Sequence, residues 1–309
     1  MTSLPARLAA LAIRLTGRRR NLAHDDPDPE TAIRRRPHPA RPSGAQRRRL
    51  AVTWELRDGF EVYTLAPRGR APAGRAIYWH GGAYTSPITH IHWRFIARMV
   101  EATGLRFTVP LYPLTPERSC AEIGAFAMAV YRVCLEADAH GPVALMGDSA
   151  GGGLALSLAM QVRDARLPRP GGLVLISPWL DVATDDPAQG RIEPTDVMLM
   201  RPGVQALGRW YAGAWATTDP RVSPLFGDLR GLPPIDLLCG SHDILVTDAR
   251  RLAARAEAEG IALTYHEEPG LMHVYPLLGL PESRRAEARI VRFLGEVGGG
   301  GAASSRGGG

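Results

Sequence analysis

A serine flanked by glycines lies between an apolar run and a helical run of the sequence. The pentapeptide Gly147-Asp148-Ser149-Ala150-Gly151 follows Val143–Met146 and precedes Leu154–Met160. This order predicts a strand, a sharp turn and a helix, which together would expose the Ser149 hydroxyl and point the N–H groups of the helix start at developing negative charge. A hydroxyl is a weak nucleophile at neutral pH, so Ser149 needs a base and donors for an oxyanion.

A second glycine motif predicts those donors. The run His80-Gly81-Gly82-Ala83-Tyr84 comes directly after an apolar, strand-like stretch. Two glycines allow backbone amides to turn toward a carbonyl oxygen, as in the oxyanion loops of lipases and esterases. We predict oxyanion donors at the N–H groups of Gly81, Gly82 and Ala150. His80 is interpreted as a structural anchor of this loop.

The expected base and acid follow the serine in the chain. Asp243 comes after the strand-like run 235–238, and His273 ends a loop after the run 263–266. Loops at the carboxyl ends of parallel strands meet at one edge of a sheet. Asp243 would hold His273 in the productive tautomer and stabilise the imidazolium form.

Other residues compete for these two roles. Asp248 is the alternative acid, and its structural role would be to brace the following helix. His242 and His266 are alternative bases, but His266 belongs to a strand and His242 adjoins the acid. We therefore predict the triad Ser149, Asp243 and His273.

The surrounding elements alternate strand-like and helical runs, which is typical of a mostly parallel sheet covered on both faces. Strands are expected at Val52–Leu56, Phe60–Leu65, Ala76–Trp79, Phe107–Leu111, Val143–Met146, Leu173–Ile176, Ile235–Leu238 and Leu263–His266. Helices are expected at about 90–103, 119–138, 150–164, 247–259 and 281–294. The fold class is therefore α/β, with an eight-stranded sheet.

Three segments interrupt this alternation. Residues 1–50 form a basic N-terminal segment expected to contribute to a lid, and their part 24–49 is expected to be an irregular connector. Residues 51–294 form the expected catalytic domain, and its stretch 180–233 is too long for a plain crossover, which indicates an inserted lid. The glycine-rich residues 295–309 are expected to be disordered.

Aromatic residues in and beside the expected lid are candidates for lining a substrate pocket. They are Tyr84, Trp179, Trp210 and Trp215. At least one of the three tryptophans is expected to belong to the core of the lid instead, because large aromatic side chains stabilise packing as readily as they bind ligands.

Composition excludes several classes of protein. Apolar residues make up 45% of the 309 residues and charged residues 22%, which suits an ordinary globular protein. The net charge of +6 would suggest a nucleic-acid partner, but residues 1–49 alone carry +8, which leaves −2 for the rest.

Three scattered cysteines indicate neither a disulfide framework nor a metal site. No run approaches about 18 apolar residues, so no spanning helix is expected and the cytoplasm is the expected location.

The first residues predict an amphipathic helix. Four leucines share one of its faces: Leu4, Leu8, Leu11 and Leu15. A helix docked over the mouth of the site is the favoured interpretation, and a weak contact with an anionic membrane surface is the alternative. A homodimer also stays open.

Five separated motifs together resemble the hormone-sensitive-lipase family of esterases, which have the α/β-hydrolase fold. The motifs are His80–Ala83, Tyr112–Glu117, Gly147–Gly152, Ser177–Asp181, and Asp243 with His273. The resemblance extends from about Trp54 to Phe293. It implies hydrolysis of short- to medium-chain acyl esters of small molecules without a cofactor, and a lid made from the N-terminal segment and the insert.

The sequence departs from this family at two places. Ala83 replaces the third glycine of the oxyanion loop. Pro113-Leu114-Thr115 replaces a more usual Arg-Leu-Ala, so a side chain that could bind neighbouring loops is missing and Glu117 is expected to be braced differently.

Two further function classes stay open. The same residues would serve an amidase, a lactonase or a deacetylase. A non-catalytic small-molecule-binding protein could also use this scaffold, although such proteins commonly lose a member of the triad, and all three are present here.

Overall fold

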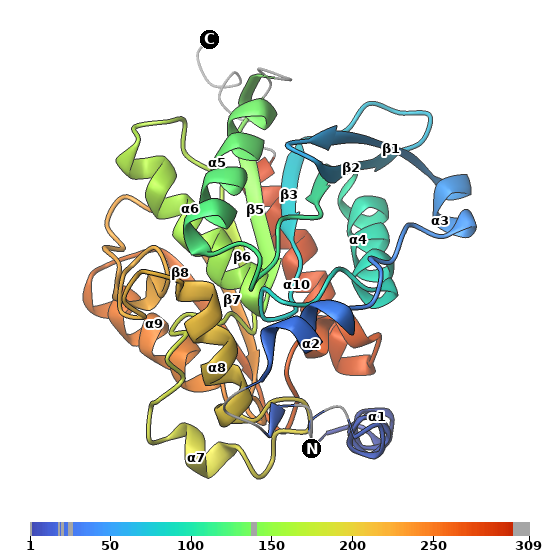
Figure 1. The fold of residues 1–309 in the computed structure, drawn as a ribbon. Coiled ribbons are helices and arrows are strands. Elements are labelled where there is room, and N and C mark those ends of the chain that lie inside the picture. Colours follow the sequence, from blue (N-terminus) through green and yellow to red (C-terminus); the bar gives the residue numbers. More distant parts are fainter. Residues whose placement is uncertain (1, 18, 20–21, 24–26, 137–140, 299–309) are drawn as a thin grey trace.

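The protein is built around one eight-stranded sheet, seen in a computed structural model that describes residues 2–17, 19, 22–23, 27–136 and 141–298 (Figure 1). The strand order is β1-β2-β4-β3-β5-β6-β7-β8. β2 pairs antiparallel with β1 and β4, and every other neighbouring pair is parallel. The predicted α/β fold class and its mostly parallel sheet are therefore confirmed.

The eight expected strands are all present, with ends within two residues of those predicted. They are β1 (Leu50–Arg57), β2 (Phe60–Pro67), β3 (Arg75–Trp79), β4 (Arg106–Pro110), β5 (Val143–Asp148), β6 (Leu173–Ile176), β7 (Ile235–Gly240) and β8 (Leu263–Glu268). The central strands β3, β5, β6 and β7 are buried along their whole length. Helices on both faces of a parallel sheet explain why these strands read as continuous apolar runs.

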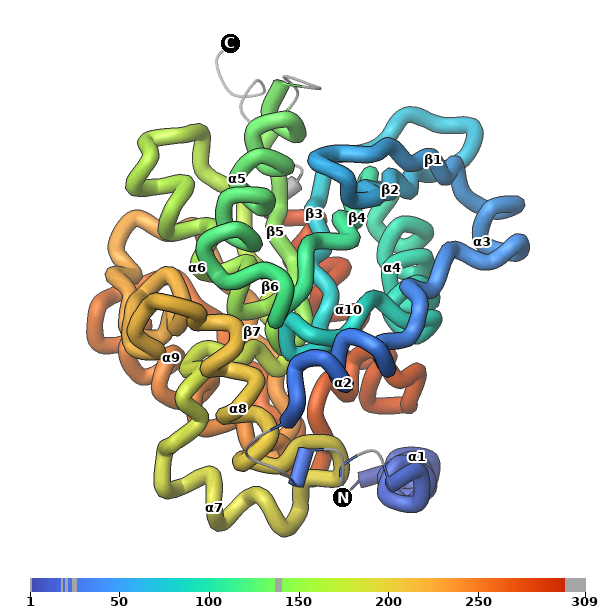
Figure 2. The backbone as a smooth tube through the Cα atoms, viewed as in Figure 1, coloured from blue at the N-terminus to red at the C-terminus, as the bar shows by residue number. Residues whose placement is uncertain are grey.

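The main helices also follow the sequence pattern. They are α4 (His90–Thr103), α5 (Cys120–Glu136), α6 (Ala150–Asp164), α9 (Val246–Ala258) and α10 (Pro281–Gly298). α5, α6 and α9 pack with the side chains on one face of the sheet, and α4 and α10 pack with those on the other. The resulting three layers are visible in Figures 1 and 2.

The N-terminal connector contains more helix than predicted. In place of an irregular 24–49 segment, the structure has α2 (Pro29–Arg34) and α3 (Gly44–Arg49), while residues 24–26 lie outside the described part. Each helix begins at a side chain that accepts a backbone N–H, Asp28 for α2 and Ser43 for α3. N-caps of this kind stabilise short helices that apolar periodicity alone does not reveal.

The last helix also runs further than predicted. α10 continues to Gly298, four residues into the stretch that was expected to be disordered, and residues 299–309 lie outside the described part. Val297 explains the extension, because it packs against the core beside Phe293 and close to Gly172. Burial of an apolar side chain extends the helix beyond what its glycine-rich sequence indicates.

Residues 180–233, which we call the insert, connect β6 to β7. They contain α7 (Gln189–Ile192), α8 (Arg201–Ala212) and the short helix η2 (Pro224–Phe226). The N-terminal segment contacts the insert, because the Arg19 guanidinium donates to the carbonyls of Glu193 and Leu199 at 2.8 and 3.1 Å. α1, α2, α7 and α8 all lie in the lower half of the molecule as Figure 1 draws it.

The first helix, α1 (Leu4–Leu15), docks on the protein through its small residues. Ala6 is buried, and Ala9, Ala10 and Ile13 pack against the same core as α10. The four leucines on the opposite face are exposed. The helix is therefore docked, but its leucine face points to solvent because the alanine face permits a closer approach to the core.

Among the helices that the structure describes, none is both long enough and apolar enough to cross a membrane. The side chains of Cys120, Cys134 and Cys239 are free thiols.

Candidate active site

Ser149 lies in the sharp turn between β5 and α6. Its φ of 53° lies in the left-handed region, and its N–H donates to the carbonyl of Ile176 at 2.9 Å. Glycine is required on either side, because a Cβ at Gly147 would overlap the backbone of Gly151, and one at Gly151 would overlap the carbonyl of Trp79. The turn holds the serine in a strained conformation at the end of a buried strand.

An unbroken chain of hydrogen bonds joins the three predicted triad residues. The Ser149 hydroxyl lies 3.0 Å from His273 Nε2, and His273 Nδ1 lies 2.8 Å from Asp243 Oδ2. Asp243 follows β7 and His273 follows β8, so the loops after three parallel strands meet at one edge of the sheet. This arrangement allows the imidazole to accept the serine proton while the carboxylate orients the ring.

The electrostatic surroundings favour a positive charge on His273. Burial alone would lower the pKa of the imidazole, but the charge and hydrogen bond of Asp243 outweigh burial, with smaller contributions from Asp196 and Asp148. The net effect raises the pKa of His273 above its ordinary value. The site therefore stabilises the imidazolium that forms when the ring takes a proton.

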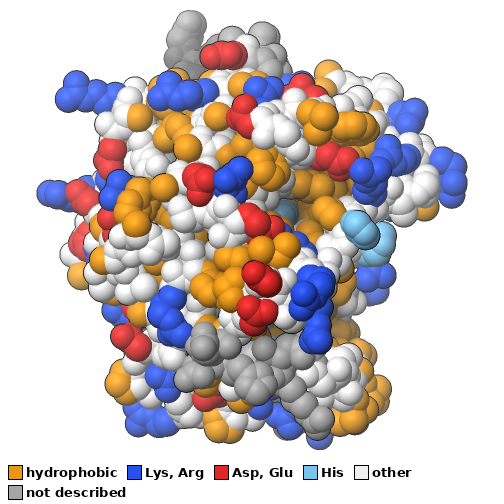
Figure 3. Space-filling model, in the orientation of Figure 1, with side chains coloured by type: hydrophobic (Ala, Val, Ile, Leu, Met, Phe, Trp, Pro, Cys, Tyr) orange, Lys and Arg blue, Asp and Glu red, His pale blue; other side chains and the backbone are white. Residues whose placement is uncertain are grey.

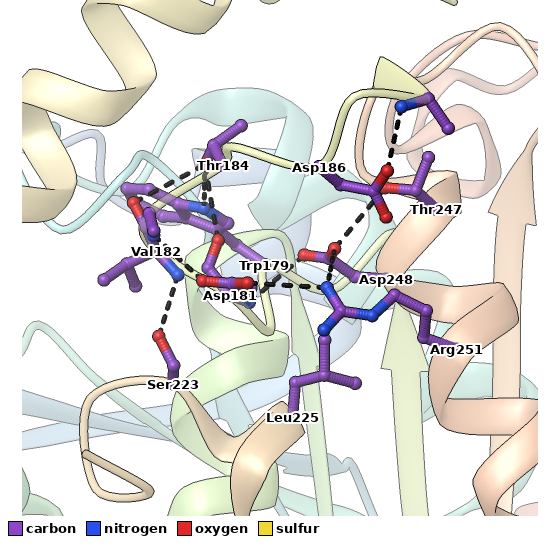
Figure 4. A network of polar contacts seen from close by, with 12 residues as sticks. Trp179, Asp181, Val182, Thr184, Asp186, Ser223, Leu225, Thr247, Asp248 and Arg251 are labelled. Atoms are coloured by element: carbon purple, nitrogen blue, oxygen red, sulfur yellow. Dashed lines mark hydrogen bonds and ion pairs between the residues drawn. The ribbon is translucent and has the colours of Figure 1, made fainter. Parts of the chain in front are cut away.

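Asp248, the alternative acid, holds the beginning of the insert instead (Figure 4). Its Oδ2 accepts the N–H of Asp181 at 3.1 Å, and Arg251 lies 3.4 Å from the Asp181 carboxylate. Burial, followed by repulsion from Asp181, raises the pKa of Asp248 to about 8, so its carboxyl group is mostly protonated at neutral pH. Asp248 therefore has a structural role, but it holds Asp181 at the start of the insert and not, as the sequence had suggested, the following helix.

The two alternative bases lie elsewhere. His266 sits on β8, where its Nε2 is 3.3 Å from Asp236, and burial lowers its pKa. His242 is exposed next to Asp243, and its N–H donates to the carbonyl of Leu271. Neither ring forms a hydrogen bond with the Ser149 hydroxyl, which lies against His273.

One predicted oxyanion donor is wrong. The N–H of Gly81 donates to Asp148 Oδ1 at 2.9 Å, so it is already occupied inside the protein. The N–H groups of Gly82, Ala83 and Ala150 have no protein acceptor among the described residues. Gly82 and Ala83 both have positive φ values, of 124° and 52°. Ala83 therefore occupies a left-handed position that a glycine would adopt with less strain.

Asp148 is the buried centre that fixes the oxyanion loop. Besides the N–H of Gly81, its Oδ1 accepts the Tyr78 hydroxyl at 2.5 Å, and its Oδ2 lies 3.4 Å from His92 Nε2. Burial alone would raise the pKa of Asp148, but the charge of His92 and these hydrogen bonds lower it. An ionised Asp148 ties β3, β5 and α4 together directly beneath the site.

His80 has the structural role expected of it. Its ring stacks on Tyr112 with 4.3 Å between centroids, and the Tyr112 hydroxyl donates to the His80 carbonyl at 2.7 Å. Burial lowers the pKa of His80 to about 4, so the ring is neutral at physiological pH. It anchors the loop through packing and does not face the serine as a second base.

The N-terminal segment supplies the brace that the Tyr112–Glu117 motif lacks. The Arg36 guanidinium binds the Glu117 carboxylate through two hydrogen bonds of 2.6 and 2.8 Å, and it also donates to the carbonyl of Thr115. Glu117 is therefore held from outside its own loop, as the sequence departure implied.

The aromatic residues proposed to line a pocket differ in their surroundings. Tyr84 and Trp179 are each about 1% exposed, and Tyr84 stacks on Tyr211 of α8 with 3.6 Å between centroids. Trp179 Nε1 donates to Thr184 at 2.9 Å. These contacts give both residues a packing role at the base of the insert, so their prediction as substrate contacts is not supported.

Trp210 and Trp215 are both partly exposed. The Arg221 guanidinium lies over the ring of Trp215, 3.7 Å from its centroid, which covers one face of the indole.

Sequence reasoning assigned no role to two residues that position the triad, Asp196 and Ser177, although Ser177 belongs to one of the five motifs. Asp196, from the insert, accepts the N–H of Ile244 at 3.0 Å, next to the triad carboxylate. Burial, and then the charge of Asp243, raise the pKa of Asp196. The Ser177 hydroxyl accepts the N–H of Val274 at 3.0 Å and so fixes the loop that carries His273. The sequence marks Asp196 only as an acidic residue directly before the apolar run 197–200, which does not indicate a role beside the triad.

A metal site is not formed by the described residues, since no group of three or more His, Cys, Asp or Glu side chains is arranged to hold an ion.

Comparison with known proteins agrees with the fold. The sequence profile of the α/β-hydrolase fold matches residues 76–277. An acetyl-hydrolase of Streptomyces hygroscopicus is 35% identical over 225 residues, covering 71% of this chain and 74% of that protein. An esterase of Acinetobacter venetianus is 29% identical over 231 residues, covering 73% of this chain and 76% of that protein.

A solved structure is similar over almost the whole chain. It is an esterase from the bacterial hormone-sensitive lipase family, with a TM-score of 0.78 at 26% identity, covering 96% of this chain and 99% of that one.

Substitution of the two candidate acids should separate their roles. Asp243→Asn is expected to lower kcat for p-nitrophenyl acetate by roughly 10³- to 10⁴-fold, because an amide at this position favours the wrong tautomer of His273. Asp248→Asn is expected to change kcat by less than about tenfold, because it replaces a mostly neutral carboxyl with a neutral amide of the same shape. Equal losses in two variants with unchanged thermal unfolding would contradict this assignment.

The rate should also follow the protonation of His273. Only the neutral imidazole accepts a proton, so kcat/KM should rise about tenfold per pH unit in acid and then level off. Because the pKa of His273 is raised, the inflection should lie above 6.5. A pH profile of p-nitrophenyl acetate hydrolysis tests this, and an inflection below 6.5 would show that another group is titrating.

Proposed function

The chain belongs to the α/β-hydrolase fold family, within the esterases similar to hormone-sensitive lipase, and we propose that this carboxylic ester hydrolase acts on short- to medium-chain acyl esters through an acyl-enzyme. The observation that carries the mechanism is the hydrogen-bonded chain from Ser149 through His273 to Asp243. A hydrolase-fold protein that only binds ligands has no need for this alignment.

In the first step, Ser149 Oγ attacks the ester carbonyl carbon while His273 Nε2 takes the hydroxyl proton. The carbonyl π electrons move to oxygen and form a tetrahedral oxyanion, and Asp243 stabilises the imidazolium. The oxyanion then collapses, the bond to the alcohol breaks, and His273 returns the proton to the leaving oxygen. The acyl group remains esterified to Ser149.

The oxyanion donors in this proposal are the N–H groups of Gly82, Ala83 and Ala150. Ala83 takes the place first predicted for Gly81, whose N–H is held by Asp148. Ala150 begins α6, so the partial positive charge at the helix start supports the same negative oxygen. Rigid donors of this kind stabilise the transition state more than the planar ester.

Water completes the cycle by the same route. His273 takes a proton from a water molecule as the water oxygen attacks the acyl carbon. When the second tetrahedral intermediate collapses, the bond to Ser149 Oγ breaks and His273 returns the proton to that oxygen, which releases the acid and the free serine. The residues of this chain supply every proton transfer.

The enclosed site favours small substrates. Ser149 is 8% exposed, and the chain that leads into the insert lies beside its turn, because the Trp179 N–H donates to the Ser149 carbonyl at 2.9 Å. A cavity of about 420 Å³ adjoins the oxyanion loop, lined by His80, Tyr112 and Leu114 from the domain and by Arg36 from the N-terminal segment. None of its described lining residues belongs to the triad, so we propose that this cavity takes the part of a small-molecule substrate that lies away from Ser149.

Acetyl esters are the favoured end of this range, because the Streptomyces relative is named for acetyl hydrolysis. Deacetylation of a larger alcohol is therefore the second candidate. Amidase and lactonase activities use the same proton transfers, but no contact in the structure favours them.

A panel of p-nitrophenyl esters from acetyl to palmitoyl tests the proposed substrate range. We expect kcat/KM to fall at least about tenfold beyond eight carbons, because each further methylene must enter a small enclosed site. Ser149→Ala should reduce hydrolysis of every ester to background, while p-nitroacetanilide should react far more slowly with the native protein. Preference for palmitoyl esters or for the anilide would contradict the proposal.

A further inference from the structure

Helix α1 presents a continuous ridge of exposed leucines. Leu4, Leu8, Leu11 and Leu15 are 66, 57, 55 and 78% exposed, and they make up half of the large hydrophobic residues that are exposed among the described residues. Scattered single apolar residues are common on protein surfaces, but four on one helical face form a patch, and patches of this kind mark interaction sites.

Contacts on the opposite face of α1 hold the four leucines toward solvent. The opposite face of α1 is docked through Ala6, which is 2% exposed. The helix start is tied to α10, because the Ser3 N–H and hydroxyl donate to the two oxygens of Glu282 at 2.7 and 2.9 Å. Turning the leucines inward would break this cap and remove the alanines from the core, so the ridge is a fixed feature of the surface.

Positive charge lies beside the leucines. Arg7 and Arg14 are exposed on α1, Arg14 also donates to the carbonyl of Pro194 in the insert at 3.5 Å, and residues 2–17 contain no acidic side chain. On an ideal helical wheel both arginines lie along one border of the leucine stripe. A helix with an apolar face and arginines beside it is typical of segments that lie in the interface of an anionic membrane, with arginines at the headgroups and leucines among the acyl chains.

α1 lies close to the loops that carry the triad, so a membrane contact through α1 would bring the active site near the lipid surface. A cleft of about 320 Å³ lies between α1 and a wall that includes Val197 of the insert, His242 and Gly270. His242 adjoins the triad acid, so the helix stands at the end of the molecule where the triad loops meet. Figure 3 shows apolar side chains at this lower right edge, where Figure 1 places α1.

We propose that α1 is an interfacial helix that places this end of the enzyme reversibly on an anionic phospholipid surface. A second copy of the chain fits the ridge less well. Antiparallel pairing of two α1 helices about a twofold axis would bring Arg7 and Arg14 of each copy close to those of the other, and like charges would then oppose the apolar contact.

Vesicle binding by the full chain tests the proposal. Flotation with vesicles of equal phosphatidylcholine and phosphatidylglycerol should recover the native protein, and recovery should fall when salt is raised, because screening weakens contacts with headgroups. The double substitution Leu8→Gln and Leu11→Gln should reduce the partition coefficient at least tenfold. Leu56→Gln is the matched control, because Leu56 is 65% exposed on β1, outside the α1 ridge, and it should leave binding unchanged.

The outcomes are distinct from those of the proposed function. Hydrolysis of soluble p-nitrophenyl butyrate should be the same in all these variants, which shows that they are folded and that the triad is intact. Absence of vesicle binding by the native chain, or equal binding by the Leu8 and Leu11 variant, would overturn the proposal. A concentration-dependent dimer that this variant abolishes, measured by light scattering, would assign the ridge to a second copy instead.

Discussion

The chemistry of this protein depends on one contact, the 3.0 Å hydrogen bond between the Ser149 hydroxyl and His273 Nε2. The two residues are 124 positions apart in the chain and come from different loops at the same edge of the sheet. Parallel pairing of β5, β6, β7 and β8 brings those loops together, and glycines at 147 and 151 allow the serine turn to approach. A shift of about 1 Å in either loop would remove the proton acceptor from reach.

Buried carboxylates hold the loops around this contact. Asp148 binds the oxyanion loop, Asp196 binds the backbone beside the triad acid, and Asp248 binds the start of the insert. A buried carboxyl group is costly unless it receives hydrogen bonds, and each of these three accepts at least one backbone N–H. The same three groups differ in pKa, because His92 and hydrogen bonds lower the pKa of Asp148, whereas burial raises the pKa of Asp196 and Asp248.

Sequence patterns could predict the sheet and the members of the triad, because both leave local signals. Alternating apolar runs gave the strand ends within two residues, and each triad residue follows a strand. The partner of a backbone amide leaves no such signal, so Gly81 could not be distinguished from Ala83 as an oxyanion donor. Asp196 was missed for the same reason, since its importance lies in a contact with Ile244 across 48 residues. Periodicity placed the four leucines on one face of α1, but it could not tell whether that face or the alanine face packs against the protein.

Labelling with an alkyl fluorophosphonate tests the central contact most directly, because a serine oxygen must displace fluoride from phosphorus and needs a base to do so. Mass mapping of the digested protein should find one adduct, on Ser149, and the labelling rate should fall at least about a hundredfold in His273→Ala. An adduct on another serine, or an equal rate of labelling without the imidazole, would contradict the account.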